Sequence, residues 1–283
     1  MPDNIMFYPI KNKTPIRFVE PNKSSLMTIQ EIKKKFKSYK DSGKERYSES
    51  IVWFDVGAMF FLLYISKKYP NLIQNNFEIQ NVRDLNIDGK DTNEKIRNID
   101  WILDQENEPR FLIYYKKSKF YFDKSLILTN SDKLQVFIVS HSFESGMGHL
   151  GCLFVYQQKA FYYDPNGLKD RDDPEYYNVF EKQLIEVLLS NYNIVYHPYK
   201  WKTGLQTSQN NEESKYKVDI MGMCCAWTYL IIELKLLNPE MTIETIEQKI
   251  RLKYRNRLTR MIVTYQQKMH LTLYQFAKEI LDV

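Results

Sequence analysis

The feature that most constrains the fold is a change of pattern after about residue 105. Before it, apolar residues recur at helical spacing, as in the stretches 28–39 and 51–68. After it, short runs rich in Ile, Val, Phe and Tyr alternate with turn-forming residues, which is typical of a meander of strands. These runs cover residues 110–116, 119–128, 134–140, 150–156 and 160–163.

Helical patterns return after the strand-like runs. Asp173 and Pro174 are a good N-cap and first-turn pair for a helix, and a short strand is expected at 193–199. The polar stretch 203–217 is interpreted as a loop. Further helices are expected at 224–237, 242–254 and 258–281. The pattern predicts an α+β fold with an N-terminal helical region, residues 1–105, and a second domain, residues 106–283, built on a central, mainly antiparallel sheet flanked by helices.

Composition excludes several classes of protein. The 283 residues carry a net charge of only +5, so nucleic-acid binding is weakly supported, and the basic cluster Lys33–Lys37 is interpreted as a solvated helix face. The most apolar stretch, 51–65, is too short to span a bilayer easily and contains Asp55. The first 13 residues lack the apolar run of a signal peptide. An intracellular protein without a membrane span is therefore expected.

The three cysteines, Cys152, Cys224 and Cys225, match neither a disulfide framework nor a common zinc spacing. Cys224 follows Gly222-Met223 at the start of an apolar helix. The partial positive charge and the free N–H groups of a helix N-terminus favour a thiolate there. Cys224 is thus a candidate nucleophile, although a small buried cysteine is the ordinary alternative.

A histidine and an aspartate flank a predicted hairpin. His149 precedes one strand and Asp164 ends the next, and a turn centred between Tyr156 and Gln157 would place the two side chains opposite each other. Opposite residues of an antiparallel ladder share a face, with Cβ atoms about 5 Å apart. Asp164 could then fix the tautomer of His149, although it also opens a good turn sequence.

The remaining histidines are weaker candidates. His141, on the preceding strand, is the natural substitute for His149, whereas His197 lacks a paired acid and His270 lies in the middle of a helix.

Two segments together resemble a known superfamily. Residues 148–167 resemble the His-strand-turn-strand-Asp hairpin of the adenovirus-protease and SUMO-protease superfamily, which is papain-like. Gly222-Met223-Cys224-Cys225-Ala226-Trp227 resembles the segment around its nucleophile, especially the Gly-aromatic-Cys-x-Ala-Trp form of relatives from large DNA viruses. The chain order His, Asp, Cys is that of the superfamily. The resemblance covers roughly residues 134–238.

The resemblance implies a role for each matching residue. His149 would be the base, Asp164 the orienting acid and Cys224 the nucleophile. The family also uses a glutamine as an oxyanion donor, usually about six residues before the cysteine, where this chain has Val218. Gln206 is the candidate for that role and Gln209 competes with it.

The family often has Trp after the histidine, where this chain has Leu150. Cys225 would be the nucleophile if the helix began one residue later, and Asn166 is an alternative to Asp164.

The expected reaction is cleavage of a peptide or isopeptide bond through a thioester, with no metal or cofactor. The resemblance implies a small residue such as Gly before the cut, and a protein substrate that is either a viral polyprotein or a ubiquitin-like conjugate. The expected location is the cytoplasm or the virion, with the host nucleus as an alternative. Two other functions fit the sequence. Some bacterial effectors with this constellation are acetyltransferases that use acetyl-CoA, and a non-enzymatic α+β interaction protein would use its basic helix and exposed aromatic residues.

Overall fold

The computed structural model describes residues 16–18, 25–41, 50–53, 55–74, 78–83, 87–105, 112–122, 133–142, 148–167, 174–198, 203–217, 220 and 223–281. The helices are α1 (Ile29–Asp41), α2 (Asp55–Lys68), α3 (Ile79–Arg83), α4 (Thr92–Gln105), α5 (Pro174–Gln183), α6 (Leu205–Tyr216), α7 (Cys224–Leu237), α8 (Ile243–Lys253) and α9 (Leu258–Leu281). The strands are β1 (Ile73–Gln74), β2 (Leu112–Lys116), β3 (Lys119–Tyr121), β4 (Leu134–Ser142), β5 (Gly148–Tyr156), β6 (Lys159–Tyr163) and β7 (Val195–His197).

The strands form one sheet in the order β3-β2-β4-β5-β6-β7, and β1 pairs with β4 beside this path. The β4–β5 and β5–β6 pairs are antiparallel, as is the β2–β3 pair at one edge. The β1–β4, β2–β4 and β6–β7 pairs are parallel. The α+β fold is therefore confirmed. The sheet is mixed: the central β4–β5 and β5–β6 pairs are antiparallel, as expected, and parallel pairs flank them.

Helices cover both faces of the sheet. Alternate residues of the central strands, such as Ile138, Cys152 and Tyr163, belong to a large core that they share with α2, α7 and α9. The intervening residues, such as Val139 and Tyr162, belong to a smaller core on the other face, which α5 covers. This alternation follows from the period of two along a strand.

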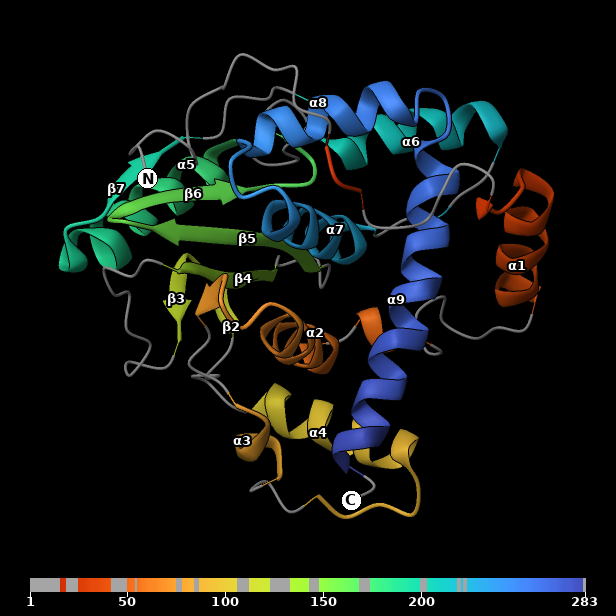
Figure 1. Ribbon diagram of the computed structural model, residues 1–283, viewed down its shortest axis with the longest axis horizontal. Helices are drawn as coiled ribbons and strands as arrows, with labels where there is room; N and C mark the ends of the chain where they lie inside the picture. Colours follow the sequence, from red (N-terminus) through yellow and green to blue (C-terminus); the bar gives the residue numbers. More distant parts are fainter. Residues whose placement is uncertain are drawn as a thin grey trace.

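The long helix α9 joins the N-terminal helices to the rest of the chain. It contacts α1, α2 and α4 as well as α6 and α7, and Figure 1 shows it crossing beside α7 and α2 towards α4. The large core accordingly includes residues from both sides of the expected boundary at residue 105, Phe60 and Trp227 among them. The division into two domains stays a prediction.

Local sequence signals explain several helix starts. Thr28 and Glu31 form the expected capping box, in which the Glu31 N–H donates to the Thr28 hydroxyl at 3.2 Å and the Thr28 N–H donates to the Glu31 carboxylate at 2.6 Å. Ahead of α4, the Glu94 N–H donates to Asp91 at 2.9 Å. Thr242 caps α8 by accepting from the Thr245 N–H at 3.2 Å.

The β5–β6 hairpin differs from its prediction by two residues. Tyr156 pairs with Lys159, and the turn residues Gln157 and Gln158 both have positive φ, 46° and 60°. Two central residues of positive φ make the tight turn that suits the twist of a hairpin. Glutamine is not a typical residue for this turn, so its type and exact register had no local signal. Continued by one residue, the ladder would place Asp164 opposite Gly151 rather than His149.

The interpretation of residues 203–217 as a loop is wrong, because α6 occupies Leu205–Tyr216. Tertiary contacts of its polar side chains support this helix, as described below. Other expectations lie outside the described residues: the Asp173 cap, the extension of β3 over 123–128, Gly222 of the cysteine motif, and the first 13 residues. Among the described residues, no helix has the length and apolar character needed to cross a membrane.

Candidate active site

The candidate nucleophile is the first residue of α7. Cys224 begins this helix, as expected, and its side chain is 7% exposed. The N–H groups of a first helical turn have no partner within the helix, so their partial positive charge falls on the Cys224 sulfur and on any group bound there.

The strand β5 ties the start of α7 to the sheet through Leu150. The Leu150 N–H donates to the Cys224 sulfur, and the Leu150 carbonyl accepts from the Thr228 hydroxyl at 3.1 Å. One residue of the strand thus contacts two successive turns of the helix. The preceding residue of β5 is His149, so this connection brings the imidazole to the thiol.

His149 and Asp164 meet in a buried hydrogen bond. The His149 Nε2 lies 2.8 Å from the Asp164 Oδ1, and the two side chains are 6% and 0% exposed. The same Oδ1 accepts from the Asn166 N–H at 2.9 Å. Asp164 therefore both opens the turn and orients the imidazole. The predicted contact is present although the predicted register is wrong, because His149 and Asp164 are diagonal neighbours on one face.

The imidazole also contacts the thiol of Cys224, so the structure brings His149, Asp164 and Cys224 together. With Nε2 bound to Asp164, Nδ1 is the ring nitrogen that is left for the sulfur. A cysteine, an imidazole and a carboxylate joined in this order are the components of a thiol-based acyl-transfer site.

The charges of these groups reinforce one another. Burial would lower the pKa of His149, but Asp164 and Cys224 raise it from 6.5 to about 10. Burial would raise the pKa of Asp164, yet the charge and hydrogen bond of His149 lower it. The hydrogen bond from Cys225 and the charge of His149 lower the pKa of Cys224 well below its usual range, against burial. These shifts favour a thiolate, an imidazolium and a carboxylate at neutral pH.

The structure separates the two adjacent cysteines. Of the two, Cys224 interacts with His149, whereas the interactions of the Cys225 side chain are with Cys224 and with the charge of Asp55. The hydrogen bond to Cys224 and burial raise the pKa of Cys225 well above its usual range. Cys225 is therefore the protonated member of the pair, and its S–H donates to the Cys224 sulfur. Sequence reasoning treated Cys225 only as a competing nucleophile.

The first turn of α6 lies against the turn that follows Asp164. The Gln206 N–H donates to the Pro165 carbonyl at 2.9 Å, and the Gly204 N–H donates to the Asn166 carbonyl at 2.8 Å. A Cβ at Gly204 would lie 2.0 Å from the Pro165 oxygen, so only glycine permits this approach. Gln206 is 8% exposed, and its side-chain oxygen has no hydrogen-bond partner among the described residues.

Gln209, the other candidate for the oxyanion donor, has a structural role. Its side-chain oxygen accepts from the Trp227 indole N–H at 2.6 Å, and its amide nitrogen donates to Glu213. Glu213 in turn accepts from the Ile220 N–H at 3.0 Å, and Glu212 accepts from the Thr259 N–H at 3.0 Å. These bonds attach α6 to α7 and α9 and explain why a polar segment forms a helix with one buried face.

Two of the alternative residues, His141 and Asn166, lie beside the triad, His141 opposite His149 on the neighbouring strand and Asn166 two residues after Asp164. His141 is buried on β4 with its Nε2 2.7 Å from the Tyr162 hydroxyl, while His197 lies on β7 and His270 on α9. Asn166 contacts Asp164 through its backbone N–H.

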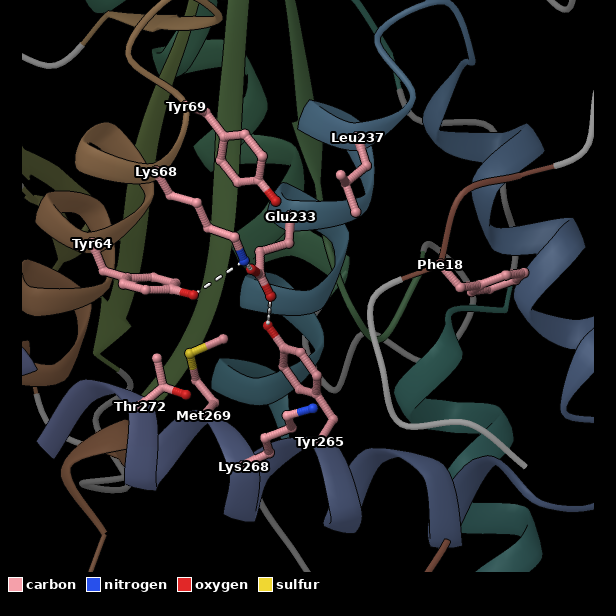
Figure 2. Close-up of a pocket in the computed structure, with 10 residues that line it drawn as sticks. All are labelled: Phe18, Tyr64, Lys68, Tyr69, Glu233, Leu237, Tyr265, Lys268, Met269 and Thr272. Atoms are coloured by element: carbon pink, nitrogen blue, oxygen red, sulfur yellow. Dashed lines mark hydrogen bonds and ion pairs between the residues drawn. The ribbon is translucent and has the colours of Figure 1, made fainter. Parts of the chain in front are cut away.

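A hollow lies at the other end of α7 from Cys224. It encloses about 360 Å³ among α2, α7 and α9. Figure 2 shows Lys68 pointing into it, with its ammonium on the buried Glu233 at 3.0 Å and on the Tyr64 hydroxyl at 3.1 Å. The other carboxylate oxygen of Glu233 accepts from Tyr265 at 2.9 Å. Lys68 also lies over the Tyr64 and Tyr69 rings, so the chain itself supplies the cation that this aromatic pocket would bind.

No group of three or more His, Cys, Asp or Glu side chains within the described ranges could bind a metal ion. Comparisons of the chain with models of protein families, with curated proteins and with solved structures gave no match.

Proposed function

We propose that this chain is a thiol-dependent peptidase in which Cys224, His149 and Asp164 act as a catalytic triad. The observation that carries the proposal is the continuous contact from the Asp164 carboxylate, through the His149 imidazole, to the Cys224 sulfur at the start of α7. A buried cysteine with a purely structural role needs neither the imidazole nor the carboxylate.

The reaction follows from the charges of the site. The Cys224 thiolate attacks the carbonyl carbon of the substrate, and the backbone N–H of Cys224 and the Gln206 amide stabilise the developing oxyanion. The His149 imidazolium then gives its proton to the leaving amine, which leaves a thioester on Cys224. A water molecule, deprotonated by the now neutral His149, hydrolyses the thioester and restores the Cys224 thiolate and the His149 imidazolium.

The proposed substrate is a protein with a small residue such as Gly before the cut, either a polyprotein or a ubiquitin-like conjugate. This choice derives from the resemblance to the adenovirus-protease and SUMO-protease superfamily. In this proposal, cleavage takes place within cells or virions.

The test measures cleavage of a glycine-ending peptide amide and labelling by a panel of ubiquitin-like probes. Cys224→Ala should abolish both. Cys225→Ala is the matched control: it removes the adjacent sulfur and should retain cleavage, at a lower rate, because Cys224 loses a hydrogen bond that stabilises its thiolate. Full activity in Cys224→Ala would remove the assignment. Transfer of acetyl from acetyl-CoA without hydrolysis of any peptide would replace the peptidase by an acyltransferase.

A further inference from the structure

The turn that follows β6 determines where the acid of the candidate triad points. Asp164 opens this turn: the Gly167 N–H donates to the Asp164 carbonyl at 3.1 Å, and the Asn166 N–H donates to the Asp164 Oδ1 at 2.9 Å. The same Oδ1 lies 2.8 Å from the His149 Nε2. The direction of the carboxylate therefore depends on the shape of residues 164–167.

The first turn of α6 contacts this turn at three points. The Gln206 N–H donates to the Pro165 carbonyl at 2.9 Å, and the Gly204 N–H donates to the Asn166 carbonyl at 2.8 Å. The same Asn166 carbonyl accepts from the Thr207 hydroxyl at 3.0 Å. The two segments approach so closely that neither of two facing glycines has room for a Cβ: Gly167 and Gly204.

The position of this helix start is not determined locally. The N-cap of α6 is Gly204, and no side chain caps the helix there. A glycine N-cap has no side-chain acceptor to offer to the first turn, unlike Ser, Thr, Asp or Asn. The first turn of α6 therefore depends on tertiary contacts for its place.

Arg251 of α8 supplies such a contact from outside both segments. Its Nη2 donates to the Thr203 carbonyl at 2.6 Å, and its Nη1 donates to the Ser208 hydroxyl, which itself donates to the Gly204 carbonyl at 3.0 Å. Thr203 and Ser208 flank the stretch 204–207, so one planar guanidinium binds both ends of the stretch that contacts the turn. Figure 1 shows α8 and α6 side by side.

A series of contacts thus leads from Arg251 through the first turn of α6 and the turn 164–167 to Asp164, and from there to His149 and Cys224. We propose that Arg251 is a positioning residue of the active site: by holding the first turn of α6 against the turn after Asp164, it keeps the Asp164 carboxylate directed towards His149. The inference rests on the proposed function, since it explains how the acid of that site is held in place.

The test compares Arg251→Ala with Glu212→Ala, which is its matched control. Each variant removes a tertiary contact of α6, because Glu212 accepts from the Thr259 N–H of α9 at 3.0 Å, and both should lower the melting temperature by a few degrees. Their effects on the site should differ. Arg251→Ala should raise the apparent pKa of Cys224 alkylation by about half a unit to one unit and lower kcat for peptide cleavage roughly three- to tenfold, with KM little changed. Glu212→Ala should leave the alkylation profile and kcat unchanged.

Two more variants separate geometry from charge. Arg251→Lys keeps the charge but lacks the planar fork, so it should shift the alkylation profile in the same direction by less, and it serves as the test if Arg251→Ala does not fold. Adding Arg251→Ala to Asp164→Asn should produce a clearly smaller shift than it does in the wild-type chain, because both changes act on the same hydrogen bond to His149.

Wild-type alkylation profiles in the Arg251 variants would overturn the proposal, as would equal shifts in Arg251→Ala and Glu212→Ala, which would show a structural contact only. An ordinary thiol pKa for Cys224 in the wild-type chain would instead refute the proposed function. The two failures are therefore distinguishable in one set of measurements.

Discussion

Replacement of Asp164 by Asn is expected to uncouple the thiol from the imidazole. Asn has the same shape and keeps an acceptor oxygen for His149 and for the Asn166 N–H, so the change removes little besides the charge. The pKa of His149 rises from 6.5 to about 10, against burial, through Asp164 and Cys224. A rise of this size corresponds to about 5 kcal/mol of preference for the imidazolium. If Asp164 supplies half of it, Asp164→Asn costs the imidazolium roughly 2–3 kcal/mol.

This cost predicts a fall of about 30- to 150-fold in the population of the thiolate–imidazolium pair at neutral pH. The assay is the rate of Cys224 alkylation by iodoacetamide as a function of pH, with the modified residue identified by mass spectrometry. In Asp164→Asn, the pH above which peptide cleavage declines should be lower, because the pKa of His149 falls. The pH below which alkylation declines should be higher, because the thiolate loses part of its stabilisation by the imidazolium. Asn166→Ala is the control, since it keeps the backbone N–H that binds Asp164. An Asp164→Asn profile within twofold of wild type at every pH would refute the reasoning.

Two further predictions concern stability. Lys235 is buried and donates to the Pro239 carbonyl at 2.8 Å, and burial lowers its pKa from 10.5 to about 7 despite Glu240 and Glu244. Between pH 7 and pH 10 the unfolded chain therefore binds more protons at Lys235 than the folded chain does. The free energy of unfolding, measured in urea, should rise by up to a few kcal/mol over this range, and Lys235→Met should remove that rise. An equal rise with pH in the variant would contradict this prediction. Lys68→Met leaves the buried Glu233 carboxylate without its ammonium partner. It should lower the free energy of unfolding in urea by about 1–3 kcal/mol, a figure kept low because the Lys68 side chain is 38% exposed. Adding Glu233→Gln should recover most of this loss, and no recovery would contradict the pairing.

The sequence predicted elements that local signals determine. The apolar run after Cys224 and the pair Asn238-Pro239 predicted both ends of α7, and the capping box at Thr28 predicted the start of α1. It also predicted that His149 and Asp164 would meet. Side chains alternate between the two faces of a strand, so a register error of two residues leaves both side chains on the same face.

The remaining features depend on tertiary contacts. Helix α6 has no apolar period and is stabilised through Gln209, Glu212 and Glu213, whose partners are at least 7 residues away in the chain apart from the Gln209–Glu213 pair. Neither the parallel β2–β4 and β6–β7 pairings nor the Tyr162–His141 bond has a local signal. The donation from Cys225 to Cys224 was missed for another reason: adjacent cysteines suggested competition for one role rather than two complementary roles.

The most direct test of the account is the ultraviolet absorbance of the thiolate, followed as a function of pH in the wild-type chain and in Cys224→Ser. Below the usual pKa of a cysteine, where buried Cys225 stays protonated, the difference between the two titrations reports the ionisation of Cys224. We predict a thiolate already present at neutral pH, with a transition well below the usual pKa of a cysteine, about 8.5. A difference that appears only above that value would show that Cys224 is an ordinary buried thiol, and the proposed triad would then be wrong.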